Sequence, residues 1–158
     1  MYQVHIGRAD ILAVNAATVV GLSLIAPAVN LFELPSNLAL SPAEYISMRR
    51  RKRGQLWNAV LALALISTLI YAGRILENET AFILCLAASG LLLTTILLLW
   101  LLIQPLDLGL QRGTVLPESF ESLQRQWEYG HAAVACLALL AFVAILLSIV
   151  AAEVSRLA

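Results

Sequence analysis

The sequence predicts an all-α integral membrane protein, an antiparallel four-helix bundle in a single transmembrane domain over residues 1–158. Composition is the first reason, because 61% of the residues are hydrophobic and mean hydropathy is +0.87, far above the usage of soluble proteins. The second reason is a set of four apolar stretches with short connections, which favour antiparallel neighbours. The clearest stretch, Ala132 to Ala152, contains no charged residue, and a helix of about 20 residues crosses the hydrocarbon core.

The first two helices are bounded by proline and capping signals. The first is expected over about residues 11–32, with a kink caused by Pro27, whose ring removes one backbone hydrogen bond. Ala26-Pro27-Ala28 has the pattern of a signal-peptidase site, but the proline argues against cleavage, so this helix is interpreted as retained. After a loop from Glu33 to Leu40, the capping-box pattern Ser41-Pro42-Ala43-Glu44 predicts that the second helix, about residues 42–73, begins there.

The third and fourth helices follow the same logic. The third is expected over about residues 81–103 and ends at Gln104-Pro105-Leu106-Asp107. The fourth, about residues 118–154, begins with Glu118 after Pro117, which puts a negative charge at the positive end of the helix dipole. One helical face then continues into the membrane, because residues recur at three- and four-residue spacing at Phe120, Leu123, Trp127 and His131.

Lysine and arginine are unevenly distributed, and this predicts orientation. The connections after the first and third helices carry seven of them: Arg49, Arg50, Arg51, Lys52, Arg53, Arg112 and Arg125. The opposite side carries three, at Arg8, Arg74 and Arg156. We therefore expect four spans with both larger loops in the cytoplasm and both termini on the non-cytoplasmic side. The basic run is interpreted first as a topology determinant and second as a site for anionic membrane lipid. A net charge of zero gives no support for a nucleic-acid partner.

In this topology every helix contributes polar residues to one layer near its cytoplasmic end. The layer consists of Asn30 and Glu33, Trp57 and Asn58, Gln104 and Asp107, and Trp127, Glu128 and His131. Ionisable groups at membrane depth tend to face the bundle interior and often mark function. One interpretation is a small cavity in which His131 exchanges protons and Glu33 or Asp107 orients its ring. The other is an interfacial belt that only anchors the helix ends.

Other chemistries have less support. No metal site is predicted, because one histidine with scattered carboxylates is a poor ligand set. A haem with His131 as an axial ligand remains open, since four-helix bundles accept such cofactors. Transport ranks last, because the centres of the third and fourth apolar stretches are almost wholly apolar apart from Thr94 and Thr95.

Three motifs resemble those of a known family: Phe32-Glu33-Leu34-Pro35, Gln104-Pro105-Leu106-Asp107, and Leu123-Gln124-Arg125-Gln126-Trp127-Glu128-Tyr129-Gly130-His131. Together they are similar to the four-helix membrane family of anthrone oxygenase-like proteins, most of which have no known function. The chain departs from the family pattern at Ala133 and Val134, where the family has a further arginine. It also has Asp107 where asparagine is commoner.

The resemblance implies an oxidoreductase or oxygenase that oxidises a lipophilic anthrone, phenolic or quinone-like ring with dioxygen, in some members without metal or flavin. His131 would be the base and Glu33 or Asp107 its partner. The substrate would be positioned by Trp57 or Asn58, in a layer that also contains Asn30, Gln104 and Trp127. Whether the chain is an enzyme is left open, because a non-enzymatic membrane protein that binds haem or a pigment, or assists assembly of a larger membrane complex, is the alternative. A homo-oligomer is compatible with both.

Overall fold

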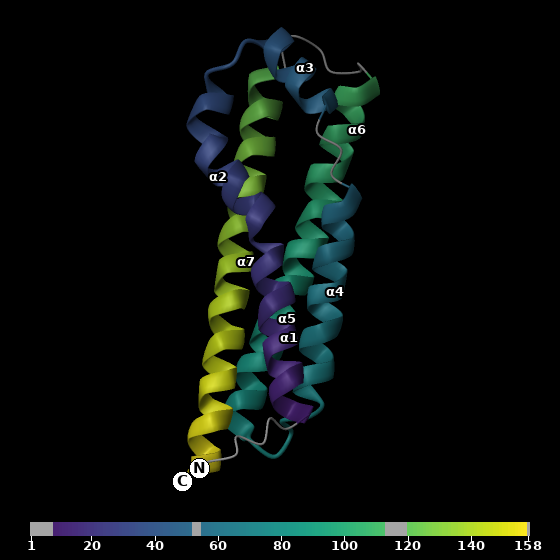
Figure 1. The fold of residues 1–158 in the computed structure, drawn as a ribbon. Helices are drawn as coiled ribbons and strands as arrows, with labels where there is room; N and C mark the ends of the chain where they lie inside the picture. Colours follow the sequence, from purple (N-terminus) through teal and green to yellow (C-terminus); the bar gives the residue numbers. More distant parts are fainter. Residues whose placement is uncertain (1–7, 52–54, 113–119, 158) are drawn as a thin grey trace.

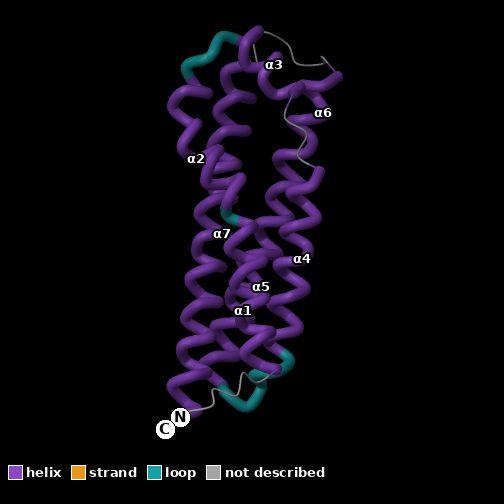
Figure 2. The backbone as a smooth tube through the Cα atoms, in the orientation of Figure 1, coloured by secondary structure: helices purple, strands orange, loops and turns teal. Residues whose placement is uncertain are grey.

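The computed structural model describes residues 8–51, 55–112 and 120–157, and every regular element in those ranges is a helix (Figure 2). The chain order is α1 (Arg8–Ser23), α2 (Ile25–Leu38), α3 (Pro42–Arg51), α4 (Gln55–Ala72), α5 (Glu79–Leu98), the π-helical segment η1 (Leu99–Ile103), α6 (Gln104–Arg112) and α7 (Phe120–Leu157). The predicted all-α class is confirmed.

The long helices lie side by side (Figure 1). The start of α1 and the end of α7 lie at one end of the molecule, and α3 and α6 lie at the other. The longest helix, α7, contacts α5 along much of its length and also contacts α1 and α2, while α4 packs against α1 and α5. The core is built largely from small residues, including Ala16, Ala64, Ala88, Ala138 and Ala141, which allow helix backbones to approach closely.

Three stretches of helix among the described residues are long and apolar enough to cross a membrane. They are Asp10–Leu38, Glu79–Leu106 and Phe120–Leu157, of 29, 28 and 38 residues. The apolar part of α4, Trp57–Ala72, is shorter and extends about 24 Å at roughly 1.5 Å per residue. Large apolar side chains on these helices, such as Leu63, Leu93 and Leu147, point away from the core, as contact with hydrocarbon requires.

The first apolar stretch is broken at Leu24, three residues before Pro27. Pro27 has no N–H to donate to the carbonyl of Ser23, and its ring crowds that carbonyl, so regular helix geometry fails in the preceding turn. The Leu24 N–H instead bonds to the Gly21 carbonyl, three residues back, at 3.1 Å. The break separates two packing partners, because α1 contacts α4 whereas α2 contacts mainly α7.

The loop expected from Glu33 to Leu40 is mostly helix. α2 continues to Leu38 and contains Pro35, although proline inside a helix removes a hydrogen bond. Asn37 is buried against α7. The local preference for a loop is therefore overridden by packing, and only Ala39, Leu40 and Ser41 connect α2 to α3.

The capping signal at Ser41 is confirmed, since α3 begins at Pro42. One oxygen of the Glu44 carboxylate accepts from the Ser41 backbone N–H at 3.1 Å and from the Ser41 hydroxyl at 2.6 Å. Both bonds favour the charged carboxylate, the hydroxyl bond most strongly, and they lower the pKa of Glu44 below its usual value.

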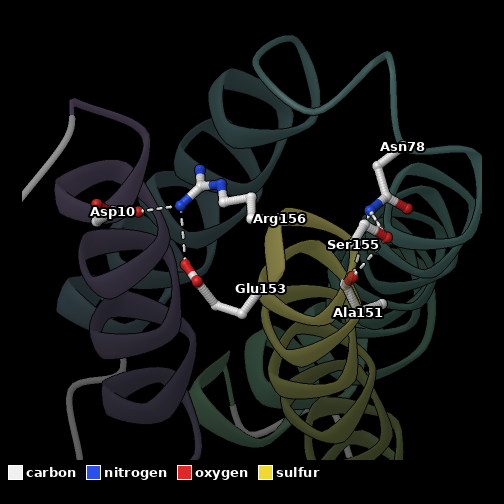
Figure 3. Close-up of polar contacts among 6 residues, drawn as sticks. All are labelled: Asp10, Asn78, Ala151, Glu153, Ser155 and Arg156. Carbon is white, nitrogen blue, oxygen red and sulfur yellow. Dashed lines mark hydrogen bonds and ion pairs between the residues drawn. The ribbon is translucent and has the colours of Figure 1, made fainter. Parts of the chain in front are cut away.

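The opposite end of the molecule is closed by polar contacts between α1, α5 and α7 (Figure 3). The Arg156 guanidinium on α7 donates to Asp10 of α1 at 2.5 Å and to Glu153, one turn earlier, at 2.8 Å. Asn78 caps α5 by accepting from the Ala81 N–H, and its amide donates to Ser155 of α7 at 2.8 Å. These contacts fix the helix ends relative to one another.

Candidate functional site

A buried carboxyl group lies at the α3 and α6 end of the molecule. Glu128 of α7 is only 1% exposed, and its Oε2 accepts a hydrogen bond from Asn37 Nδ2 of α2 at 3.3 Å. Asn37 is itself 3% exposed. A carboxyl group away from water is costly unless hydrogen bonds compensate its desolvation, so the Asn37 contact is part of what allows Glu128 to be buried.

Gln124 extends this contact into a network. It lies one turn before Glu128 on the same face of α7, and its Nε2 donates to the backbone carbonyl of Asn37 at 2.6 Å. That carbonyl belongs to the last turn of α2 and also accepts from the Leu40 N–H, three residues on, at 3.3 Å, so Gln124 adds a second donor at the helix end. Gln124 is 6% exposed. Two polar side chains of α7 thus hold the end of α2, one through its backbone and one through the Asn37 side chain.

His131 lies against Trp127, one turn earlier in α7. Their rings are stacked, with centroids 3.6 Å apart and planes at 22°. His131 Nδ1 is 3.1 Å from the Trp127 backbone oxygen. Because a carbonyl oxygen only accepts, Nδ1 carries the proton in this contact and the lone pair of the neutral ring is on Nε2. The ring is therefore oriented with a basic nitrogen directed away from its own backbone.

Tyr45 of α3 forms an aromatic cluster with two side chains from the first turns of α7. It is fully buried and meets the ring of Phe120 edge-on at 5.7 Å and that of Trp127 at 6.5 Å. Edge-to-face geometry is favourable between aromatic rings. Through these contacts the short helix α3 covers the start of α7 and fixes the Trp127 ring on which His131 stacks.

The π-helical segment η1 packs against Trp127 through Ile103. Pro105 has no N–H, and just before it the Gln104 N–H bonds to the Leu99 carbonyl, five residues back. Ile103, at the end of η1, is buried in a cluster with Trp127 and Val134. It lies so close to Gly130 that a Cβ there would be 3.4 Å from the Ile103 side chain. The π-helical turn thus places the Ile103 side chain in contact with α7.

The structure places the predicted site residues at different depths. Trp127 is buried, and His131 is half-buried. The other half-buried members of the predicted layer are Asn30, Glu33 and Trp57. The Trp57 indole nitrogen is itself buried, and no hydrogen-bond acceptor for it is present among residues 8–51, 55–112 and 120–157. A buried donor of this kind is one that a ligand oxygen would satisfy.

Other predicted residues lie outside the buried cluster. Asn58 and Gln104 are exposed. Asp107 is in α6, and its side chain lies outside the described part of the structure. The same holds for the side chains of Arg49, Arg50 and Arg51 at the end of α3, while Lys52 and Arg53 lie wholly outside the described residues.

The site residues predicted from the sequence did not include Asn37, Gln124 or Tyr45, and Glu128 was named in the polar layer without a role. One signal was present in the sequence. Glu128 precedes His131 by three residues, the Glu-x-x-His spacing of metal ligands in di-iron bundles, and Gln124 precedes Glu128 by four. Asn37 carried no such signal, because it falls in the segment expected to be a loop. Among the described residues no three His, Cys, Asp or Glu side chains gather closely enough to hold a metal ion.

Comparison of the chain with protein-family models, with curated proteins and with solved structures gives no match. The assignment of a function therefore rests on the residues of the site alone.

Proposed function

We propose that the chain forms a four-span antiparallel membrane bundle in which α3 and α6 face the cytoplasm and both termini lie on the other side. Two observations support this. The apolar outer surface of α4 resembles that of the three longer stretches, with Leu63, Ile66 and Ile70 exposed, and the basic residues are concentrated at the α3 end.

Cysteine labelling tests this topology. In a background lacking both native cysteines, Cys85 and Cys136, Ser47→Cys and Ser122→Cys should both be protected from an impermeant thiol reagent in intact cells. Glu77→Cys, in the connection between α4 and α5, should be labelled. Labelling of Ser47→Cys and Ser122→Cys on opposite sides would contradict the four-span arrangement.

We further propose that the protein is a small membrane oxidoreductase of the oxygenase type, acting on a lipophilic phenolic, anthrone-like or quinone-like molecule at this cytoplasmic end. The observation that carries the proposal is the His131 ring, which stacks on Trp127 and bonds through Nδ1 to the Trp127 carbonyl, three residues after the buried Glu128. A histidine with one nitrogen fixed to the backbone is oriented for proton transfer at the other.

In the proposed reaction, His131 Nε2 removes an acidic C–H or O–H proton from the ring. The resulting enolate or phenolate gives its electron pair to dioxygen, and a C–O bond forms. The peroxide takes back the proton and loses water, so that an anthrone-type ring and O₂ yield the quinone and H₂O. The protein supplies the base and an apolar surrounding in which the anion is poorly hydrated and therefore reactive.

The remaining residues of the predicted layer have positioning roles in this proposal. The Trp57 indole N–H, a buried donor with no acceptor among residues 8–51, 55–112 and 120–157, would donate to the ring oxygen. Asn30, Asn58 and Gln104 would line the approach to the site. Glu33 or Asp107 would stabilise the imidazolium that forms when His131 takes up the proton.

Oxygen uptake tests the proposal. Purified protein in lipid nanodiscs is supplied with an anthrone, and the rate is compared with that of empty nanodiscs. His131→Gln should lower the catalysed rate about 10²-fold or more, the usual contribution of a general base. Gln126→Ala, an exposed residue on the same helix, serves as the control and should not change it. An unchanged rate in His131→Gln would exclude His131 as the base.

A haem or pigment protein is the second candidate, because an imidazole whose Nδ1–H bonds to a backbone carbonyl presents Nε2 as metal-binding histidines do. Visible spectra of oxidised and dithionite-reduced protein distinguish the two. A Soret band that is lost in His131→Ala would favour haem, and a colourless protein would favour the oxygenase.

A further inference from the structure

A pocket of about 390 Å³ lies outside the buried network, where the end of α2, the start of α3 and the first turns of α7 meet. Its volume is in the range of roughly 300–1,000 Å³ that small-molecule sites occupy. One part of its lining is apolar and includes Leu38, Leu40 and Phe120. The other part is polar and consists of side chains from one stripe of α7.

The polar stripe includes Arg125, whose ion pair with Glu121 is long and exposed. Glu121, Arg125 and Tyr129 follow one another at four-residue spacing and all line the pocket. The Arg125–Glu121 ion pair has an N–O distance of 4.0 Å, and the two side chains are 68% and 86% exposed. Exposed pairs of this kind contribute little, so the Arg125 guanidinium is available to another anion. Tyr129 is 58% exposed and presents both an aromatic face and a hydroxyl.

Gln124 connects the pocket to the candidate site. It lines the pocket, yet its amide is bonded to the Asn37 backbone. The Asn37 side chain in turn bonds to Glu128. The pocket is therefore separated from the buried carboxyl group by one hydrogen-bonded layer, and a molecule resting there lies at the outer edge of that network.

We propose that this pocket binds an amphipathic aromatic monoanion, a phenolate or carboxylate, as the docking site from which substrate reaches the His131 layer. The anionic oxygen pairs with Arg125, the Tyr129 ring stacks on the flat body, and the apolar wall covers its other face. A single negative charge is favoured because Glu121 already places one carboxylate beside Arg125. The docking role rests on the proposed oxygenase function, but binding by the pocket does not.

Binding of 2-naphthoate and of its uncharged methyl ester to the full chain in phosphatidylcholine nanodiscs tests the inference. Arg125→Gln should weaken naphthoate binding about two- to fivefold, the range that an exposed ion pair supplies, and leave the ester unaffected. Glu121→Gln should strengthen naphthoate binding by a similar factor, since it removes the competing carboxylate. Arg74→Gln removes an exposed arginine in the connection between α4 and α5 and should change neither.

Further measurements on the same nanodiscs test where the probes bind and what they recognise. Leu38→Trp, which fills the pocket, should abolish binding of both probes, and retained binding would place their site elsewhere. Equal effects of Arg125→Gln on naphthoate and ester would overturn charge recognition. Loss of wild-type naphthoate binding when phosphatidylglycerol is added would assign the pocket to a lipid headgroup and overturn the proposal. His131→Gln should retain naphthoate binding, so failure of the pocket and failure of the catalytic proposal are observed separately.

Discussion

The buried contact between Asn37 and Glu128 should make a measurable contribution to stability. The two side chains are 3% and 1% exposed, and their hydrogen bond is 3.3 Å long. Asn37→Leu keeps the branching at Cγ and the number of side-chain heavy atoms but removes a donor from the Glu128 carboxyl group. Glu128→Met removes the acceptor of the Asn37 amide. Each should lower the free energy of unfolding by about 1–3 kcal/mol, the cost of a buried polar group that loses its partner.

The double variant separates this contact from general effects of packing. With both polar groups replaced by apolar ones, no buried polar group loses the hydrogen bond of this contact, so the double variant should be about 1–2 kcal/mol more stable than the sum of the single effects predicts. Reversible unfolding in mixed micelles, followed by circular dichroism, measures all of these free energies. Gln126→Leu, at an exposed position of α7, is the control and should stay within about 0.5 kcal/mol of wild type.

Additive effects would contradict a direct coupling between Asn37 and Glu128. If the double variant equals the sum of the single variants within about 0.5 kcal/mol, the two side chains are not coupled. α2 would then be held on α7 by apolar contacts and by the Gln124 bond to its backbone, and Glu128 would need another source of compensation for its burial.

Three further predictions concern local features. Ser148→Ala should lower the free energy of unfolding by about 0.6–1.7 kcal/mol, because the buried hydroxyl donates across the α5–α7 interface at 2.7 Å. Ser89→Ala is the control, since the Ser89 hydroxyl bonds within α5, and an equal or larger effect of Ser89→Ala would contradict the prediction. Gly90→Ala should stabilise by about 0.5–1 kcal/mol in the same unfolding assay, since nothing lies within 4 Å of the added Cβ, and a destabilised variant would argue against it. The lowered pKa of Glu44 means that its support of α3 is present above about pH 4.5 and is lost as pH falls through the folded-state pKa. An NMR titration should give a carboxyl pKa below 4.5 that Ser41→Ala returns toward this value.

Most helix positions were predictable, because the signals for them are local. The expected end of the third helix at Gln104-Pro105-Leu106-Asp107 was wrong, because the π-helical segment η1 leads directly into α6, which continues to Arg112. The apolar stretches, the proline that breaks the first of them and the Ser41 cap all act within a few residues of themselves. The continuation of α2 through Pro35 was not predictable in this way. Packing of Asn37 against a helix 91 residues away in the sequence outweighs the local preference for a loop.

The candidate site was predictable in part. A tryptophan and a histidine just before an apolar helical stretch pointed to Trp127 and His131, whose rings are indeed stacked. The acidic partners of His131 predicted from the sequence were Glu33 and Asp107. Glu128, the carboxyl group that is almost wholly buried, was not singled out, because a residue pattern shows that several carboxylates share a layer but not which of them faces a neighbouring helix.

Residues close together in the sequence were enough to indicate that the chain is helical and that its helices are apolar enough for a membrane. These properties are sums over neighbouring residues and need no knowledge of packing. Which polar groups contact one another depends instead on how distant helices pack. The break at Leu24 lets α1 pack on α4 and α2 on α7, and the face of α7 covered by α2 is the one that carries Gln124 and Glu128. That choice depends on the relative placement of distant helices, because a side chain is buried only where another element covers it.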